Sequence, residues 1–401
     1  MTASKPTPLV PKLRFPEFRE AGEWERRRLG RVGEFIGGGT PNTSVPEYWD
    51  GDIQWFTPTE VKDRNLSKSK GAIASQGLNN SSAKLLPESE VNAFWHYWLV
   101  QHSSELTKRA SGSAFLEIGK TELREIPALR PDQREQQRIA DCLGSLDDLI
   151  AAEGRRLEAL RRHKQGLMQQ LFPQPGETVP RLRFPEFRDE PSWSTPLLAD
   201  LYGFKPTNTL SRDKLNHVTG TIRSIHCGDI HTKFKPLFRV CGEHVPYVSP
   251  DSPANGIDDA AFCEEGDIVL ADASEDLNDI GKAIEVVSLD GERVVAGMHT
   301  ILATRLGSIP VVGFGGQLFQ STAVRTGIKK VAQCAKVYGI SAKRISTVPI
   351  PVPPTEAEQQ KIAICLGSLD NLIVAESRRI EALRQHKQGL MQQMFPDPVR
   401  K

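Results

Sequence analysis

An internal repeat constrains this chain more than any other feature of its sequence. The segment Pro11–Arg19 recurs almost unchanged 169 residues later as Pro180–Arg188. Three further segments recur 223 residues later: Glu135–Ala140 as Glu358–Ala363, Leu143–Asp147 as Leu366–Asp370, and His163–Gln170 as His386–Gln393. The residues enclosed by these copies do not resemble one another. The pattern therefore indicates one frame, present twice, that carries two different modules.

The two offsets differ by 54 residues, so the first interior is shorter than the second by that length. A solenoid is a poor interpretation, because every repeat of a solenoid does the same stacking job. Similar frames with different inserts favour one scaffold that presents two binding specificities. A plain gene duplication whose surfaces have drifted is the alternative.

Two long helices are predicted, one in each copy of the frame, over residues 131–173 and 354–396. From Ile139 onward, apolar residues recur at alternating steps of four and three, which is the seam of a coiled coil. Proline bounds each helix at both ends. Glu153 and Lys164 are polar residues within the first seam and are expected to set its register.

The second helix is the obvious partner for the first, because a stripe of this length must be buried. We expect the two helices to pair antiparallel, with the modules at opposite ends and related by a pseudo-twofold axis. A rod of about 60 Å exceeds one turn of DNA, so it would serve as a ruler between two half-sites. A coiled coil used only for dimerisation is the alternative.

The interiors predict two modules of the α+β class, at residues 1–130 and 174–353, so that the fold is two recognition domains of mixed short strands and helices separated by the two long helices. In the second module, Gly266–Ala271 and Val294–Gly297 are expected to be strands, and Gln320–Ala332 a helix.

Clusters of basic and polar residues in both modules are candidate DNA contacts, since Lys and Arg neutralise phosphates while Thr, Ser and Arg can contact base edges. Solvated surface charge is an equally good interpretation of any one of them. In the first module they are Thr57, Thr59, Lys62, Arg64, Lys68, Lys70, Lys108 and Arg109. In the second they are His231, Thr232, Lys233, Lys235, Arg325, Lys329, Lys330, Lys336, Tyr338, Ser341, Lys343 and Arg344.

Composition excludes several classes of protein. The formal net charge of +1 gives no bulk attraction to a polyanion, so any DNA contact must come from local patches. The six cysteines include no Cys-x-x-Cys pair, which argues against a disulfide framework and a zinc site and favours a reducing compartment. No apolar run approaches a membrane span, and the N-terminus has no signal-peptide core. We therefore expect a cytoplasmic protein without metal or cofactor.

The repeated segments, taken in order and in duplicate, resemble the specificity subunits of type I restriction-modification systems across the whole chain. The second module adds two stretches similar to one group of these recognition domains, His226–Phe234 and Gly266–Asp276. The resemblance implies a non-catalytic subunit that reads a bipartite site in double-stranded DNA. It also implies two methyltransferase subunits as partners for adenine-N6 methylation, and restriction and translocase subunits for ATP-dependent cleavage.

The first module departs from the family pattern. Leu85–Val91 parallels Phe262–Val269, and Asn92–Trp98 parallels Gly313–Phe319, so the middle of the second module has no counterpart. We expect this shortened module to have lost central strands and to read its half-site with weak or relaxed specificity. A subunit that survives only as a protein-interaction scaffold is the alternative function.

The sequence gives little support for an enzyme. Ala114–Thr121 fits a loosened phosphate-binding pattern, but its loop is bulky where a phosphate needs glycine and close backbone amides. Gly37–Pro41 reads as a turn, because no strand and helix with a ribose-binding acid surround it. His163 and His386 recur on the long helices, where a surface or interface position is expected.

Overall fold

The computed structural model describes residues 9–33, 38–56, 69–84, 93–110, 118–251, 257–334 and 337–397. The chain divides into two compact units. Unit 1 comprises Met1–Arg155 and Ser377–Lys401, and unit 2 comprises Arg156–Glu376. Each unit therefore contains one module and part of each long helix.

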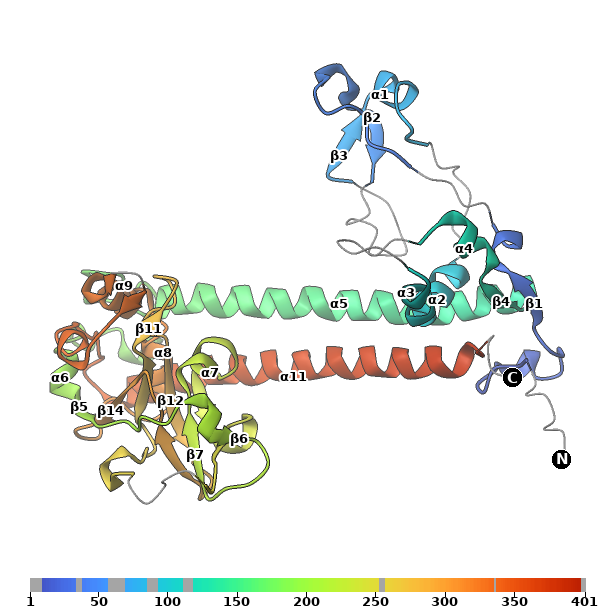
Figure 1. The fold of residues 1–401 in the computed structure, drawn as a ribbon. Coiled ribbons are helices and arrows are strands. Elements are labelled where there is room, and N and C mark those ends of the chain that lie inside the picture. The colour runs from blue at the N-terminus through green and yellow to red at the C-terminus, as the bar shows by residue number, and fades with distance from the viewer. Residues whose placement is uncertain are drawn as a thin grey trace. The chain divides into compact units, whose positions relative to one another are not determined.

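The two predicted long helices are present and begin and end where the prolines indicated (Figure 1). Helix α5 spans Gln133–Leu171 and helix α11 spans Glu356–Met394. The side chain of Asp132 accepts a hydrogen bond from the Glu135 backbone N–H at 2.9 Å, and Thr355 accepts one from Glu358 at 3.3 Å. These are N-caps, which satisfy backbone donors that the first helical turn leaves without partners.

In unit 1 the start of α5 packs against the end of α11. Ile139 and Leu143 share a buried cluster with Met391, Met394 and Phe395. Across the same seam, Lys387 Nζ contacts Asp147 Oδ1 at 2.6 Å. Arg379 contacts the seam residue Glu153 at 2.7 Å.

In unit 2 the end of α5 packs against the start of α11. Leu171 lies in one buried cluster with Ile362 and Leu366. Lys164 Nζ contacts Asp370 at 2.6 Å, and Arg156 contacts Glu376 at 3.7 Å. Together with the contacts in unit 1, this shows that the helices pair antiparallel. The predicted α+β class with two antiparallel long helices is confirmed.

The repeated N-terminal segment of each frame is fastened to a helix start by a buried ion pair. Arg14 donates to both carboxylate oxygens of Glu135 at 2.7 Å, and Arg183 donates to those of Glu358 at 2.8 and 2.7 Å. The glutamate side chains are 1% exposed in both copies. Two parallel N–H···O bonds fix the arginine geometrically as well as electrostatically.

The module of unit 1 is built from short elements. Strand β1 (Glu25–Arg28) pairs with β4 (Pro127–Arg130), and β2 (Trp49–Trp55) pairs with β3 (Gly71–Ile73), both antiparallel. Its helices are α1 (Ser75–Asn79), α2 (Ala93–Gln101), α3 (Ser103–Arg109) and α4 (Lys120–Glu125), with 3-10 turns η1 (Pro16–Phe18), η2 (Leu29–Arg31) and η3 (Pro46–Tyr48). Two two-stranded sheets are all that the described part of this module contains.

The module of unit 2 has larger sheets. A five-stranded sheet has the order β5-β14-β10-β12-β8, with only β12 and β8 parallel, and a four-stranded sheet has the order β13-β7-β9-β6. The bounds are β5 Tyr202–Lys205, β6 Leu215–Asn216, β7 Ile222–Ile225, β8 Leu237–Arg239, β9 Tyr247–Val248, β10 Ile268–Ala271, β12 Ala283–Ser288, β13 Arg293–Ala296 and β14 Thr300–Arg305. Both strands predicted from sequence are confirmed as β10 and β13.

A small third sheet in unit 2 has the order β11-β16-β15, formed by Ala273–Ser274, Tyr338–Gly339 and Gln333–Cys334. The helices are α6 (Leu198–Leu201), α7 (Cys227–Thr232), α8 (Phe314–Leu318), α9 (Thr322–Val331) and α10 (Ala342–Ile345). The 3-10 turns are η4 (Pro185–Phe187), η5 (Arg212–Lys214), η6 (Val240–Gly242) and η8 (Asp259–Ala261). Helix α9 is the predicted helix, shorter by two residues at its start and one at its end. No helix among the described residues is long and apolar enough to cross a membrane.

The unlike modules dock on the frame through equivalent aromatic contacts. In unit 1, Phe94 of α2 packs on Trp24 at 5.9 Å and on Phe395 at 5.3 Å between ring centroids. In unit 2, Phe314 of α8 packs on Trp193 at 6.3 Å and on Phe172 at 5.7 Å.

Polar contacts to the helix seam repeat in the same way. Tyr97 Oη donates to Asp147 Oδ2 at 2.6 Å, and Gln317 Nε2 donates to Asp370 Oδ2 at 2.7 Å. Each aspartate thus joins a lysine of the other long helix to a side chain of its module. The sequence match of Asn92–Trp98 to Gly313–Phe319 brought the right segments together but was wrong by one residue, because the contacts pair Phe94 with Phe314 and Tyr97 with Gln317. Strands β12, β13 and β14 fall in the stretch that this match leaves without a counterpart, while Leu85–Val91 lies outside the described residues.

Helix α8 of unit 2 has an additional attachment to its sheet. Glu285 of β12 is fully buried and accepts hydrogen bonds from the backbone N–H groups of Gly313 at 2.9 Å and Gly316 at 2.7 Å. Burial raises the pKa of Glu285 to about 7, although these hydrogen bonds act in the opposite direction. The carboxyl therefore ties the start of α8 to the five-stranded sheet.

We predict that Arg183→Ala lowers the stability of unit 2 by about 3 kcal/mol or more, because it leaves the buried Glu358 carboxylate without its partner. Thermal and urea unfolding of the full chain measure the change. Arg188→Ala, which removes an exposed arginine of the same repeated segment, is the matched control and should leave the transition in place. Equal, small shifts for the two variants would show that the ion pair does not hold the frame.

Candidate nucleic-acid interface

Most candidate contacts of the first module lie outside the described residues, namely Thr57, Thr59, Lys62, Arg64 and Lys68. Lys70 is exposed just before β3. Lys108 and Arg109 are exposed at the end of α3, where both contact Glu105, at 4.0 and 3.0 Å. The described part of this module therefore does not gather its candidates into one surface. The phosphate-binding-like segment Ala114–Thr121 also lies partly outside the described residues, and its Lys120 begins α4 as an exposed residue.

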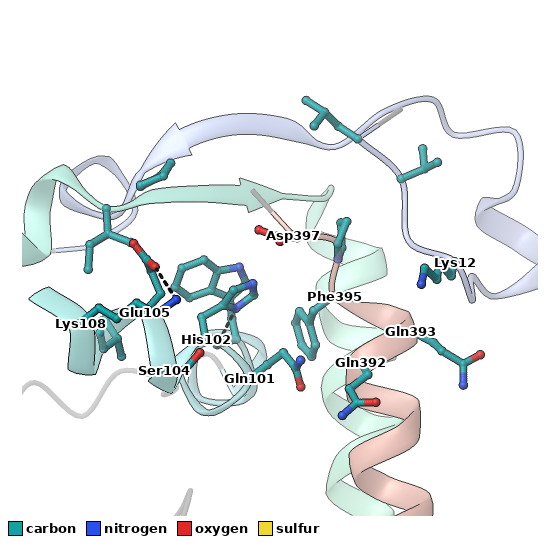
Figure 2. Close-up of a pocket in the computed structure, with 17 residues that line it drawn as sticks. Lys12, Gln101, His102, Ser104, Glu105, Lys108, Gln392, Gln393, Phe395 and Asp397 are labelled. Carbon is teal, nitrogen blue, oxygen red and sulfur yellow. Dashed lines mark hydrogen bonds and ion pairs between the residues drawn. The ribbon is translucent and has the colours of Figure 1, made fainter. Parts of the chain in front are cut away.

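A cavity of about 550 Å³ opens beside α3 in unit 1 (Figure 2). It is lined by the segment after Leu9, by α2 and α3, and by the end of α11. The His102 ring stacks on Trp98 at 4.1 Å, and its Nδ1 lies 2.8 Å from the Trp98 carbonyl oxygen. Burial lowers the pKa of His102, which favours the neutral ring. Because its walls mix cations such as Lys108 with carboxylates such as Asp397, the cavity does not define one class of ligand.

In unit 2 the candidates gather around one loop. We call Ala273–Gly281, which comprises β11 and the turn after it, the β11 loop. His231 of α7 contacts it directly, because His231 Nε2 lies 3.0 Å from the Ala273 carbonyl oxygen. Lys282, directly after the loop, returns a hydrogen bond from Nζ to the His231 carbonyl oxygen at 2.6 Å. Helix α7 and the β11 loop are therefore one surface.

Helix α9 supports the same loop from the other side. The Arg325 guanidinium donates to the carbonyl oxygens of Gly281, Asn278 and Ile280 at 2.8, 2.8 and 2.7 Å. Lys329 Nζ donates to Asn278 Oδ1 at 2.7 Å. Both side chains were expected to face DNA phosphates, and the structure places both against the loop.

A hairpin of β15 and β16 forms the third side. Tyr338 of β16 pairs with Ser274 of β11, and the Ile340 backbone N–H donates to the Asp272 carbonyl oxygen at 2.9 Å. Lys336 lies outside the described residues. Three segments far apart in the sequence therefore converge: α7, the β11 loop and the hairpin.

The remaining candidates occupy the flanks of this surface. Thr232 Oγ1 donates to the Gly228 carbonyl oxygen at 2.8 Å, and Lys233 contacts Asp229 at 2.8 Å. Ser341 caps α10 through the Arg344 N–H, and Arg344 Nη1 donates to the Val331 carbonyl oxygen at 3.4 Å. Lys233, Lys235, Lys330 and Lys343 are all exposed.

Two residues of this surface escaped the sequence reasoning. Arg212 donates to Asp229 at 2.8 Å and lies 3.3 Å from His226 Nδ1. Although burial opposes ionisation of Asp229, hydrogen bonds from Lys233 and Arg212 hold its pKa below the usual value. Burial and the Arg212 charge lower the pKa of His226. His226 stood in a stretch that the sequence had marked by family resemblance, whereas no local pattern marked Arg212.

Comparisons with known proteins agree with this architecture. The sequence profile of the type I restriction modification DNA specificity domain matches residues 68–162. The type I restriction enzyme MjaIX specificity subunit of Methanocaldococcus jannaschii is 30% identical over 179 residues, which cover 35% of this chain and 41% of that protein. The EcoR124I/EcoR124II specificity subunit of Escherichia coli is 31% identical over 117 residues, covering 29% of this chain and 27% of that one. The matched regions thus span less than half the length of these two curated relatives.

A crystal structure of the type I restriction-modification S subunit from M. genitalium has the same fold. It superimposes with a TM-score of 0.56 at 13% identity and covers 97% of this chain and 99% of that one. The paired helices and the two frame-mounted modules thus define a class of protein, a scaffold that carries two domains. Residues 68–162 of the chain thus match the type I restriction modification DNA specificity domain, parts of the chain are similar to two curated specificity subunits, and its fold matches that of the M. genitalium S subunit.

Proposed function

We propose that this chain is the DNA-recognition subunit of a type I restriction-modification complex and performs no chemistry itself. One observation carries the proposal: the frame makes the same contacts in both units, while the modules it holds differ. The pairs Arg14–Glu135 and Arg183–Glu358 are equivalent, as are the module contacts to Asp147 and Asp370. A frame that holds two different modules through equivalent contacts suits a protein that recognises two different half-sites.

The surface around the β11 loop is the proposed DNA contact of the second module. Exposed Lys235, Lys330 and Lys343 supply charge for phosphates, and the loop supplies polar side chains for base edges. Because the net charge of the chain is only +1, binding must depend on such local patches. The proposed domain boundaries are those predicted from the sequence, 1–130 and 174–353 for the modules.

We further propose that two copies of one methyltransferase subunit bind the long helices, in the cytoplasm, and that restriction and translocase subunits join that complex. Leu149 of α5 and Leu372 of α11 are equivalent residues of the repeat, and both are exposed, at 38% and 51%. An exposed leucine at the same position of each copy supports two equivalent docking sites for one partner.

A second candidate function is a subunit in which only the second module reads DNA, while the first serves as a protein scaffold. The small sheets of the first module favour it, since that module's described residues contain nothing that corresponds to β12, β13 and β14. Its aromatic docking through Phe94 is nevertheless complete.

We predict that the chain, co-purified with its methyltransferase subunit, binds duplex DNA with an affinity that falls steeply between 50 and 200 mM salt, by roughly 10³-fold if about six phosphates are contacted. Fluorescence anisotropy against salt concentration measures this. Genome-wide mapping of N6-methyladenine from the same pair of subunits should show two half-motifs at fixed spacing. A single half-motif would favour the second candidate function, and salt-independent or absent binding would contradict both.

We predict that Leu149→Asp combined with Leu372→Asp abolishes co-purification of the methyltransferase subunit, while either change alone removes one of two copies. Burying a carboxylate in an apolar contact is costly, whereas both sites are exposed in the free chain. Mass measurement of the complex gives the stoichiometry. Val179→Asp is the matched control, because Val179 is an exposed apolar residue outside the helices, at 53%. Unchanged stoichiometry in the double variant would place the methyltransferase elsewhere.

A further inference from the structure

The tip of the β11 loop is exposed, but its backbone is fixed. The four consecutive residues Glu275–Asn278 are exposed. The Asp276 carboxylate accepts from the Asn278 backbone N–H at 2.8 Å, and Ile280 behind the tip is fully buried. Gly281 closes the loop at φ +62°, where a Cβ atom would lie 2.6 Å from Ile328 of α9. A polar tip on a rigid base is what direct readout requires, because discrimination between bases depends on placed donors and acceptors.

Arg325 is the main support of that base. Its three hydrogen bonds go to backbone carbonyl groups of a single turn, Asn278 to Gly281, and burial lowers its pKa. A planar guanidinium with a fixed fork suits this task better than a lysine, which is a flexible point charge. With these donors already used inside the protein, Arg325 is poorly placed to serve as a phosphate contact.

The acidic charge of the loop is largely offset by nearby cations. Asp272, Glu275, Asp276 and Asp279 bring four carboxylates from the loop and the residue before it, and Arg325, Lys329 and Lys282 bring three cations from residues bonded to the loop or next to it. Opposite charges this close reduce the repulsion that DNA phosphates would otherwise exert on an acidic tip. Carboxylates can then reach base edges, where they accept hydrogen bonds from exocyclic amino groups.

We propose that Glu275 and Asp276 read the exocyclic amino group of a cytosine or adenine in the half-site of the second module, and that Arg325 is the positioning residue that holds the loop for this reading. The proposal rests on the proposed function of the chain as a DNA-recognition subunit. It assigns Arg325 to specificity through the loop and not to phosphate contact. Leu277, exposed at 37% between the two acids and Asn278, is placed to touch a thymine methyl group.

The test is a methylation map of the genome for variants of the full chain co-expressed with its methyltransferase subunit. Glu275→Gln and Asp276→Asn keep the shape of each side chain but replace an acceptor-only group by an amide. Each should relax or change one position of the second half-motif by roughly tenfold or more, and leave the first half-motif and the spacing as they are. Glu190→Gln, at an exposed glutamate just after the repeated segment, is the matched control and should leave the map unchanged.

Arg325→Met removes the three donors while keeping an unbranched side chain, and it should relax the same half-motif without reducing the salt dependence of DNA binding. Lys343→Met, at an exposed lysine, should instead lower occupancy at all sites equally. The inference is overturned if Arg325→Met lowers binding uniformly and reduces the salt slope by about one charge, or if the two acid variants leave the motif intact. A wild-type chain that directs no methylation would overturn the proposed function itself, which separates the two failures. Unfolding midpoints for all variants identify any loss caused by misfolding alone.

Discussion

The antiparallel pairing of α5 with α11 is the constraint on which the rest of the structure depends. Each helix carries a seam that would expose apolar residues to water if it stood alone. The pairing buries that seam and is held in register by ion pairs at equivalent positions, Asp147 with Lys387 and Asp370 with Lys164. Because the two helices repeat nearly the same sequence, their antiparallel pairing repeats the main contacts, so the two units share one set of mounting points.

Those mounting points explain how unlike modules are tolerated. Each aspartate of the seam also accepts a hydrogen bond from its module, from Tyr97 in one unit and from Gln317 in the other. The donor is a tyrosine in one unit and a glutamine in the other, but both donate one hydrogen bond to the seam aspartate. A module therefore needs only a phenylalanine for the aromatic cluster and a donor three residues later on the same helix, and the rest of its sequence is free to change. Under the proposed function, this freedom would let the specificity of one module change while the frame is kept.

Sequence reasoning reached the frame more easily than the site. Helix bounds followed from Pro131 and Pro173 and from the seam spacing, because capping and periodicity are local properties. The polar seam residues Glu153 and Lys164 were expected to set register, and both make cross-helix ion pairs. Contacts between segments far apart in the sequence left no comparable local pattern. The convergence of α7, the β11 loop and the β15–β16 hairpin depends on sheet order, which no spacing rule provides.

Individual charges were harder still to interpret from sequence. Arg325 and Lys330 lie close together on one helix, yet Arg325 is bonded to backbone carbonyl groups while Lys330 is exposed. Their difference comes from the turn Asn278–Gly281, about 45 residues earlier in the chain. A basic cluster thus predicts a charged face but not which of its members are used internally. Sequence reasoning is limited in the same way for the shortened first module. The two repeat offsets give the length that is missing, but they do not show how its loss affects DNA recognition.

Reversing the seam pair of unit 2 tests the pairing most directly. The measurement is the unfolding free energy of Lys164→Asp, Asp370→Lys and the double exchange, compared as a double-mutant cycle. Each single change replaces this 2.6 Å ion pair by two like charges that face one another across the seam and should destabilise, while the double exchange should recover about 1 to 3 kcal/mol of coupling. Gln317 can accommodate the exchange, because its amide can turn to present an oxygen that has no partner among the described residues. Additive losses in the double exchange would contradict the pairing of α5 with α11 in this register.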